Sequence, residues 1–173
     1  VDTDTKNSVL ESLAVLLQEN APALIDENRR DLEEGERQGL TNAMLDRLRL
    51  SSENILGMAE GVRQVCGLPD PVGEELERTV RPNGIDVRKV RVPIGVIGII
   101  YESRPNVTVD CAALCFKSGN ACILRGGKEA FFSNRALAAI ISRALRAHDI
   151  DEAVVQLIPT TDRRALNVLL KLD

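Results

Sequence analysis

Three short apolar runs, separated by segments long enough to form helices, limit most strongly what this chain can fold into. Wholly apolar strands that alternate with helices are typical of a parallel sheet with helices on both faces. The sequence therefore predicts an α/β fold in which residues 93–173 form a partial Rossmann-type, dinucleotide-binding domain. Because the pattern stops at Leu172-Asp173, before a further strand, we expect this domain to be incomplete. The runs span Gly95–Ile100, Ala121–Leu124 and Val154–Ile158, and the expected helices span about 107–117, 129–147 and 161–172.

A helical segment is expected before this pattern, over residues 1–75. Apolar side chains recur at helical spacing over residues 9–17, and Asn20 followed by Pro22 resembles the capped start of a second helix. Two further apolar patterns predict a short third helix and a longer fourth one. In the third helix, the side chains expected to face inward are Met44, Leu45 and Leu48.

A β-hairpin is expected over residues 76–92. Strand-like runs at 76–80 and 85–92 flank the Asn83-Gly84 pair. An Asn-Gly pair between two such runs favours a tight hairpin turn, because glycine readily adopts a positive φ. The hairpin therefore separates the helical segment from the first buried strand.

The composition argues against several classes of partner. The formal net charge is −4, from 22 basic and 26 acidic residues, and no basic stripe stands out, which disfavours nucleic-acid binding. No apolar run reaches the roughly 18–20 residues of a membrane span, so we expect a cytoplasmic protein without a membrane partner. The four cysteines form no CxxC pair, so no metal site is expected. Buried, reduced thiols are the expected state of Cys66, Cys111, Cys115 and Cys122.

Polar residues follow the first apolar run, and in a parallel sheet the carboxyl ends of the strands are where ligands bind. Ser103, Arg104 and Asn106 come just before a helix whose N-terminus favours negative charge. Arg104 can bind a phosphate or carboxylate through two hydrogen bonds, and Asn106 can donate to a developing oxyanion. The alternative is a helix cap beside a surface arginine, and the spacing leaves both possibilities open.

The segment Arg125-Gly126-Gly127-Lys128 follows the second apolar run. Its glycines allow a ligand to approach the backbone closely, and two cations flank them. In dinucleotide sites, a basic residue here can bind the 2′-phosphate of NADP, where an acid would favour NAD. Thr160 and Thr161, after the third run, are candidates for the rim of the same cofactor site. A plain strand–helix turn and a helix cap are the respective alternatives.

Two long segments resemble a known family. RVPIGVIGIIYESRPNVTVD and SGNACILRGGKEAFFSN are similar to signature segments of gamma-glutamyl phosphate reductase (glutamate-5-semialdehyde dehydrogenase), a branch of the aldehyde dehydrogenase superfamily. The upstream NRRDLEEGERQGLTNAMLDRL and LPDPVGE are also similar to the N-terminal helices of that family. The resemblance covers nearly the whole chain and implies an aldehyde-dehydrogenase-like fold.

The resemblance implies that the complete protein reduces L-glutamyl 5-phosphate with NADPH, giving L-glutamate 5-semialdehyde and phosphate in proline biosynthesis. In the superfamily a cysteine thiolate attacks the acyl carbon, expels the leaving group and forms a thioester that accepts hydride. That cysteine lies in a downstream catalytic domain. We therefore expect this chain to be the N-terminal, cofactor-binding portion and to be inactive by itself.

For this substrate, the loop at the end of the first strand supplies the candidate residues, because it lies beside a helix N-terminus. Ser103 and Arg104 are the candidates for substrate binding, and Asn106 is the candidate catalytic oxyanion donor. The resemblance also implies a homo-oligomer, in which the hairpin could serve assembly, and a partnership with the kinase that makes the unstable acyl phosphate. A non-catalytic nucleotide-binding or interaction module is the alternative function. The candidate cofactor-binding residues are Arg125, Gly126, Gly127, Lys128, Thr160 and Thr161.

Overall fold

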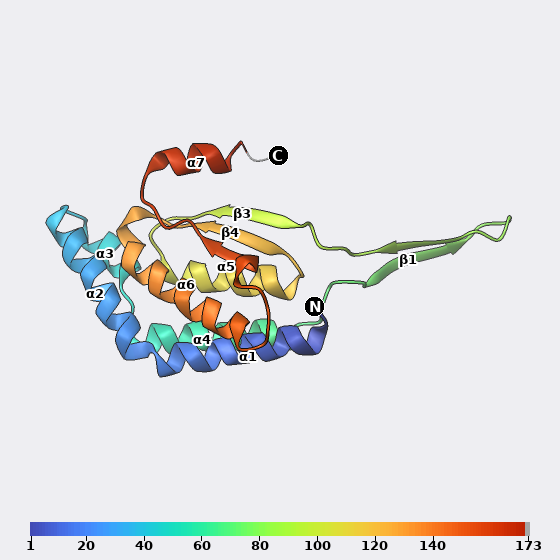
Figure 1. The fold of residues 1–173 in the computed structure, drawn as a ribbon, viewed down its shortest axis with the longest axis horizontal. Coiled ribbons are helices and arrows are strands. Elements are labelled where there is room, and N and C mark those ends of the chain that lie inside the picture. Colours follow the sequence, from blue (N-terminus) through green and yellow to red (C-terminus); the bar gives the residue numbers. More distant parts are fainter. Residues whose placement is uncertain (172–173) are drawn as a thin grey trace.

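The computed structural model describes residues 1–171, apart from the side chain of Arg163. Helices α5 and α6 lie against one face of a three-stranded sheet, and α1 and α4 form a further layer beneath them (Figure 1). A two-stranded hairpin extends from one end of this body, and α2 and α3 lie at the other end. The predicted α/β fold, with a helical segment, a hairpin and a parallel sheet, is confirmed.

Side-chain caps determine where most of the N-terminal helices begin. Asp2, Thr41 and Ser51 each accept a hydrogen bond from a backbone N–H in the first turn of α1, α3 and α4. Asn20 forms no such cap; its amide donates instead to a carbonyl oxygen near the end of α1, at 2.7 Å. The helices span Thr3–Glu19 (α1), Ala21–Arg37 (α2), Asn42–Leu48 (α3) and Ser52–Gly67 (α4).

The prediction that Met44 faces inward is wrong. The short helix α3 buries Leu45 and Leu48, which lie three residues apart on one face. Successive residues of a helix point about 100° apart, so Met44 does not share the direction of Leu45. Its side chain is 42% exposed and lines the cavity described below.

The hairpin is formed by β1 (Glu75–Val80) and β2 (Asp86–Val90), which pair antiparallel. Gly84 in the turn has a φ of 86°, the conformation that favours glycine. Arg78 on β1 forms an ion pair with Asp86 on β2 at 3.0 Å. All residues of β2 are exposed, and the hairpin projects away from the rest of the chain (Figure 1).

The parallel sheet consists of β3, β4 and β5 in that order. Ile100 at the end of β3 lies opposite Arg125 at the end of β4, and Leu124 lies opposite Leu157 of β5. The segments that follow the strands therefore meet at one edge of the sheet. The elements are β3 (Val96–Ile100), α5 (Pro105–Lys117), β4 (Ala121–Arg125), η1 (Lys128–Ala130), α6 (Phe131–Arg146), η2 (Glu152–Val154), β5 (Val155–Leu157) and α7 (Arg163–Leu169).

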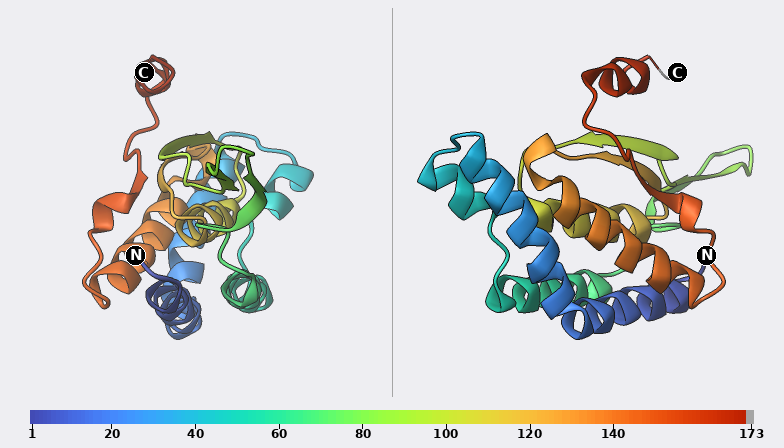
Figure 2. Two further views of the ribbon diagram at one scale, coloured as in Figure 1. Left: turned by 90° about the vertical axis from the view of Figure 1, so that its right-hand side faces the viewer. Right: turned by 60° about the vertical axis from the view of Figure 1, so that its left-hand side comes forward.

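The two faces of the sheet are covered unequally, so the prediction of helices on both faces holds only in part. On one face, α5 and α6 pack over Leu124, which is fully buried (Figures 1 and 2). Over the other face, α7 brings Leu169 within 3.4 Å of the position that a Cβ on Gly98 would take. Val96 and Ile100 of β3 are still 65% and 49% exposed. The predicted helix end at Leu172 and the expected break at Asp173 lie outside the described residues.

One hydrophobic core joins the helical segment to the α/β part. Leu10 and Leu17 of α1, Ile55 of α4, Val109 of α5 and Leu137 of α6 are all almost completely buried in the same cluster. Burial of each such side chain contributes about 1.5–3 kcal/mol to folding. The helices of residues 1–67 therefore help to hold the sheet and its loops in place.

A polar cluster also ties α1 to the end of the helical segment. Lys6, 3% exposed, donates to Asp70 Oδ2 at 2.8 Å, and Thr3 donates to the same oxygen at 2.9 Å. The backbone N–H of Val72 donates to Asp70 Oδ1 at 3.0 Å. Burial raises the pKa of Asp70, but these hydrogen bonds outweigh burial and hold the pKa at about 2.

We expect Asp70→Asn to remove part of the acid sensitivity of folding. The pKa of Asp70 is about 2 in the folded chain and 3.8 ordinarily, so its contribution is complete above about pH 4 and is lost as the pH falls through 2. Urea denaturation between pH 2 and 6 measures this directly. As the pH falls, the free energy of unfolding should decrease less steeply in Asp70→Asn than in wild type, whereas replacement of the exposed Asp4 in α1 by asparagine should leave this dependence as in wild type. If the free energy of unfolding of Asp70→Asn falls with decreasing pH as steeply as that of wild type, Asp70 does not account for this acid sensitivity.

No helix within residues 1–171 has both the length and the apolar character that crossing a membrane requires.

Candidate functional site

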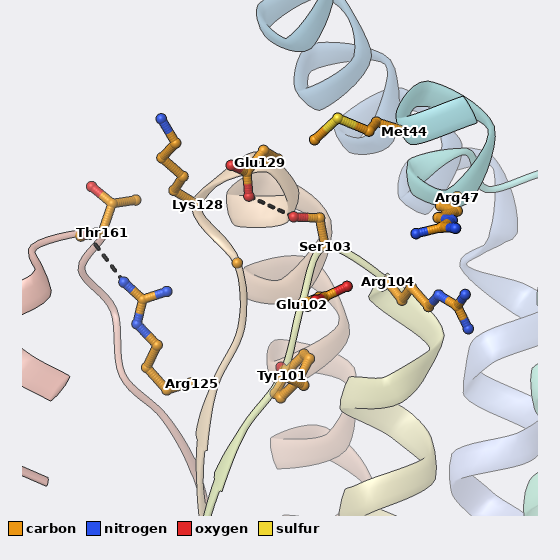
Figure 3. A pocket seen from close by; sticks show the side chains of 11 residues that line it. Met44, Arg47, Tyr101, Glu102, Ser103, Arg104, Arg125, Lys128, Glu129 and Thr161 are labelled. Carbon is orange, nitrogen blue, oxygen red and sulfur yellow. Dashed lines mark hydrogen bonds between the residues drawn. The ribbon is translucent and has the colours of Figure 1, made fainter. Parts of the chain in front are cut away.

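A cavity of about 410 Å³ opens at the edge of the sheet where β3 and β4 end (Figure 3). The loops after β3, β4 and β5 line it together with α3. Its volume lies within the range of small-molecule sites. The structure thus brings together residues from all three predicted motifs, namely Ser103, Arg104, Arg125, Gly127, Lys128 and Thr161.

Hydrogen bonds hold the loop after β3 from two sides. Ser103 Oγ donates to Glu129 Oε2 at 2.5 Å, which connects this loop to the loop after β4 (Figure 3). The Tyr101 hydroxyl lies 2.7 Å from Thr108 Oγ1, and Thr108 donates in turn to Asn134 Oδ1 at 2.9 Å. Burial raises the pKa of Tyr101 to about 12, so the phenol stays protonated at neutral pH.

The side chain of Arg125 bridges the loops after β4 and β5. Its Nη2 donates to the carbonyl oxygen of Thr161 at 3.2 Å, and its Nη1 donates to the carbonyl oxygen of Gly126. The Nε is buried and has no hydrogen-bonding partner among the described residues. A buried donor without a partner costs about 1–3 kcal/mol, so the hydrogen-bonding capacity of this side chain is not fully used within the described residues.

Gly126 and Gly127 are required by contacts within the chain. A Cβ on Gly126 would lie 2.2 Å from Asn134 Nδ2 and 3.0 Å from the Tyr101 ring. A Cβ on Gly127 would lie 2.5 Å from Ser103 Oγ and 3.0 Å from the Ser103 backbone nitrogen. That both glycines admit a ligand stays a prediction; in this structure they allow the loop after β4 to lie close to Tyr101, Ser103 and Asn134.

We expect Gly126→Ala to destabilise the chain by about 1–3 kcal/mol, the usual effect of overpacking. The added methyl group would displace Asn134 or Tyr101, which are joined through Thr108. Gly57→Ala is a matched control, because no atom lies within 4 Å of the Cβ it would add in α4. Thermal denaturation should show a lower Tm for the first variant and an equal or higher Tm for the control. Equal Tm values for both variants would mean that the loop accommodates the added methyl group without a loss of stability.

The residues after β5 take different positions. Thr161 lines the cavity, whereas Thr160 does not and instead accepts a hydrogen bond from the backbone N–H of Asp162 at 3.2 Å. Asp162 caps α7 by accepting from the N–H of Arg164 at 2.8 Å. Lys128 is exposed, and its ammonium lies at the outer rim of the cavity (Figure 3).

Asn106 lies in a neighbouring cleft of about 600 Å³, bounded by α3, α4 and the start of α5. Its amide donates to Asp110 Oδ2 at 3.1 Å. It is the second residue of α5, and Arg104 holds the cap position without a capping side-chain bond. The alternative in which Asn106 caps the helix therefore does not apply. The structure does not bring Asn106 into the cavity that contains Ser103 and Arg104, although Arg47 lines both spaces.

Five residues that line the cavity are absent from the candidate site residues, namely Met44, Arg47, Tyr101, Glu102 and Glu129. Glu129, the partner of Ser103, follows the Arg125–Lys128 segment directly and could have been identified from that position. Met44 and Arg47 reach the cavity from α3, far away in the sequence. No local pattern marks them, because only the packing of α3 brings them to this edge of the sheet.

The cysteines lie away from the cavity lining. Cys115 and Cys122 are buried as predicted, whereas Cys66 and Cys111 are only partly buried. Burial raises the pKa of Cys111 and Cys115, and raises that of Cys122 to about 12. These three thiols hold little thiolate at neutral pH, which makes them poor nucleophiles.

The charges around the cavity favour an anionic ligand. An excess of positive charge in a partly enclosed cavity attracts phosphate or carboxylate groups, and arginine can bind either with two hydrogen bonds. The two basic residues of the loop after β4, Arg125 and Lys128, both line this cavity. The charged lining residues are Arg47, Arg104, Arg125 and Lys128, against Glu102 and Glu129.

The chain is similar to curated proteins over its full length, although no family model matches it. Gamma-glutamyl phosphate reductase from Opitutus terrae is 57% identical over 171 residues, which are 99% of this chain and 40% of that protein. The protein of the same name from Carboxydothermus hydrogenoformans is 56% identical over 173 residues, 100% of this chain and 42% of that protein. The chain thus spans 40–42% of the length of these relatives.

Solved structures agree with this similarity. The crystal structure of gamma-glutamyl phosphate reductase from Thermotoga maritima matches with a TM-score of 0.97 and 41% identity, over 99% of this chain and 42% of that one. An acetylating aldehyde dehydrogenase from Geobacillus thermoglucosidasius matches with a TM-score of 0.72 and 19% identity, over 99% of this chain and 35% of that one. The second match supports the fold alone. With its aldehyde-dehydrogenase-like fold, the chain belongs to the gamma-glutamyl phosphate reductase family.

Proposed function

We propose that this chain is the cofactor-binding portion of an NADPH-dependent reductase that converts L-glutamyl 5-phosphate to L-glutamate 5-semialdehyde and phosphate in proline biosynthesis. The observation that carries the proposal is the position of Arg125, whose guanidinium lines the cavity at the carboxyl end of a parallel strand. The name of the relatives supports the reaction. It also disfavours the alternative of a non-catalytic module.

In this proposal the residues after β4 hold the adenosine side of the cofactor. Arg125 binds the 2′-phosphate of NADPH, and Lys128 adds a second positive charge at the rim. The peptide groups of Gly126 and Gly127 and the residues Thr160 and Thr161 border the same space. When bound, the cofactor supplies the hydride for the reduction.

The loop after β3 faces the substrate in this proposal. Arg104 attracts the phosphate or α-carboxylate of glutamyl phosphate, and Ser103 offers a hydroxyl held by Glu129. Asn106 donates an amide hydrogen to the oxyanion that develops when the acyl group is attacked. Asp110 accepts the other amide hydrogen and so orients the carboxamide.

We also propose the setting in which the complete protein acts. It forms a homo-oligomer through the projecting hairpin, in line with the full exposure of β2. It works in the cytoplasm and receives its unstable acyl phosphate from the kinase that makes it. The attacking cysteine belongs to a part of the protein outside this chain, in line with the raised thiol pKa values of Cys111, Cys115 and Cys122.

The function is tested by comparing the pure chain with the complete protein. The reaction is followed in reverse, as NADPH formed from L-glutamate 5-semialdehyde, phosphate and NADP⁺. The complete protein should turn over, and the chain should not, because the thioester step lacks its nucleophile. Turnover by the chain that is abolished by replacing Cys66, Cys111, Cys115 or Cys122 would contradict the proposal. Inactivity of the complete protein with these substrates would contradict the reaction itself.

A further inference from the structure

A buried polar network connects α2 to the elements on both sides of the cavity. Its two members on α2 are Asn28 and Asp31, which are 1% and 2% exposed. Buried polar groups of this kind persist where their hydrogen bonds fix a specific arrangement. We propose that Asn28 and Asp31 are positioning residues that fix the loop after β4 and helix α3 as opposite sides of the cofactor cavity. The inference rests on the proposed function only for its effect on cofactor binding.

Asp31 caps a helix to which it does not belong. Its carboxylate accepts hydrogen bonds from the N–H of Phe132 at 3.0 Å, from the N–H of Ser133 at 2.8 Å and from Ser133 Oγ at 2.6 Å. Helix α6 has Ala130 at its own cap position and no capping side chain there. Since the first N–H groups of a helix need acceptors, Asp31 fixes the start of α6, which directly follows the Arg125–Ala130 segment.

Asn28 extends this connection to the other side of the cavity. Its Nδ2 donates to the carbonyl oxygen of Leu48 at 2.8 Å and to Ser133 Oγ at 3.0 Å, and its Oδ1 accepts from the N–H of Leu50 at 2.8 Å. Leu48 is the last residue of α3, the helix that carries Met44 and Arg47. One carboxamide therefore links the end of α3 to the start of α6.

The two elements held by this network lie across the cavity from each other. Met44 and Arg47 are on one side, and Arg125 and Lys128 are on the other (Figure 3). The carboxylate of Asp31 also occupies the first turn of α6, a position where ligand phosphates often bind in α/β proteins. At this side of the cavity an anionic ligand is therefore left to the side-chain cations, whose positions depend on how the loops and α3 are fixed.

The first test measures cofactor binding by the complete protein. In the direction of NADPH formation, Asp31→Asn and Asn28→Ala should raise the KM for NADP⁺ by about 10-fold with a smaller effect on kcat, because misplacement of binding groups by about 1 Å can cost up to about 10²-fold. Leu24→Ala is the matched control, since Leu24 is buried on α2 but takes no part in the network. It should lower the Tm without raising the KM. A KM that rises in all three variants in proportion to the loss of Tm would overturn the inference.

Arg125→Ala separates this inference from the proposed function. If Arg125→Ala raises the KM for NADP⁺ and Asp31→Asn does not, the cofactor site stands and the positioning role is wrong. If neither variant changes the KM, the loop after β4 does not bind the cofactor. An unchanged KM in both variants would count against the proposed function. The positioning role would then be decided by the methionine-methyl experiment described next.

The second test needs no cofactor and uses the 173-residue chain. The sequence contains two methionines, Met44 at the cavity and Met58 in the core, 5% exposed. With ¹³C-methyl-labelled methionine, Asn28→Ala should shift or broaden the Met44 signal and leave Met58 unchanged. Leu24→Ala should not reproduce this selective change. If loss of the Met58 signal shows that Asn28→Ala is unfolded, the milder Ser133→Ala variant takes its place. A Met44 signal that is unaltered in a folded variant of the network would overturn the inference.

Discussion

Replacing Asn106 by alanine in the complete protein should lower kcat by about 10²–10³-fold, the usual loss when an oxyanion donor is removed. The KM for glutamate 5-semialdehyde should change little, because the oxyanion exists only near the transition state. Asn106 donates one amide hydrogen to Asp110 at 3.1 Å, which leaves the other for a substrate oxygen. Steady-state kinetics in the direction of NADPH formation would measure both parameters.

Two companion variants make this result specific. Arg104→Ala should mainly raise the KM, because a cation that attracts the substrate anion stabilises the bound substrate as well as the transition state. Asp110→Ala should lower kcat less than Asn106→Ala, since it frees the carboxamide without removing it. If Asn106→Ala leaves kcat within a few-fold of wild type and lowers the Tm, the residue only stabilises the start of α5. The functional role of this loop would then rest on Arg104.

Replacing Arg125 by alanine should weaken NADPH binding by about 10- to 100-fold, because a charge-assisted hydrogen bond to a phosphate contributes about 1.5–3 kcal/mol. NADH lacks the 2′-phosphate, so its binding should fall much less. Fluorescence titration of the complete protein with each cofactor would give the two Kd values. Lys128→Ala should have a smaller effect of the same kind, because Lys128 is exposed.

The control for this experiment must account for the structural bonds of Arg125. Its guanidinium also donates to the carbonyl oxygens of Gly126 and Thr161, so the Tm of the variant needs to be measured alongside. Arg164→Ala is a matched loss of charge after β5, at an exposed residue outside the cavity that pairs with Asp162. Arg164→Ala should change the Kd of neither NADPH nor NADH. Equal loss of NADPH and NADH binding in Arg125→Ala would mean that Arg125 binds another part of the cofactor or only holds the loops.

The sequence predicted the order and type of the elements because local patterns determine them. The apolar runs became β3, β4 and β5, and the Asn83-Gly84 pair lies in the predicted hairpin turn. The carboxyl ends of parallel strands meet at one edge, so Ser103, Arg104 and Arg125 could be expected to lie together. Periodicity alone could not predict that the second face of the sheet is covered only by α7 in the described residues, because that depends on which helices return to it.

Only the tertiary structure decided which side chains complete the cavity. Met44 and Arg47 reach it because Asn28 holds the end of α3, and the loop after β4 is fixed because Asp31 caps α6 from another helix. Asn106, close to Arg104 in sequence, instead lines a neighbouring cleft, because it is the second residue of α5 and lies on the side of that helix near α3 and α4. The sequence by itself determined the elements and the edge of the sheet where the site lies, through local periodicity and turn chemistry. The composition of the site depended on packing between residues far apart in the chain, which no local pattern records.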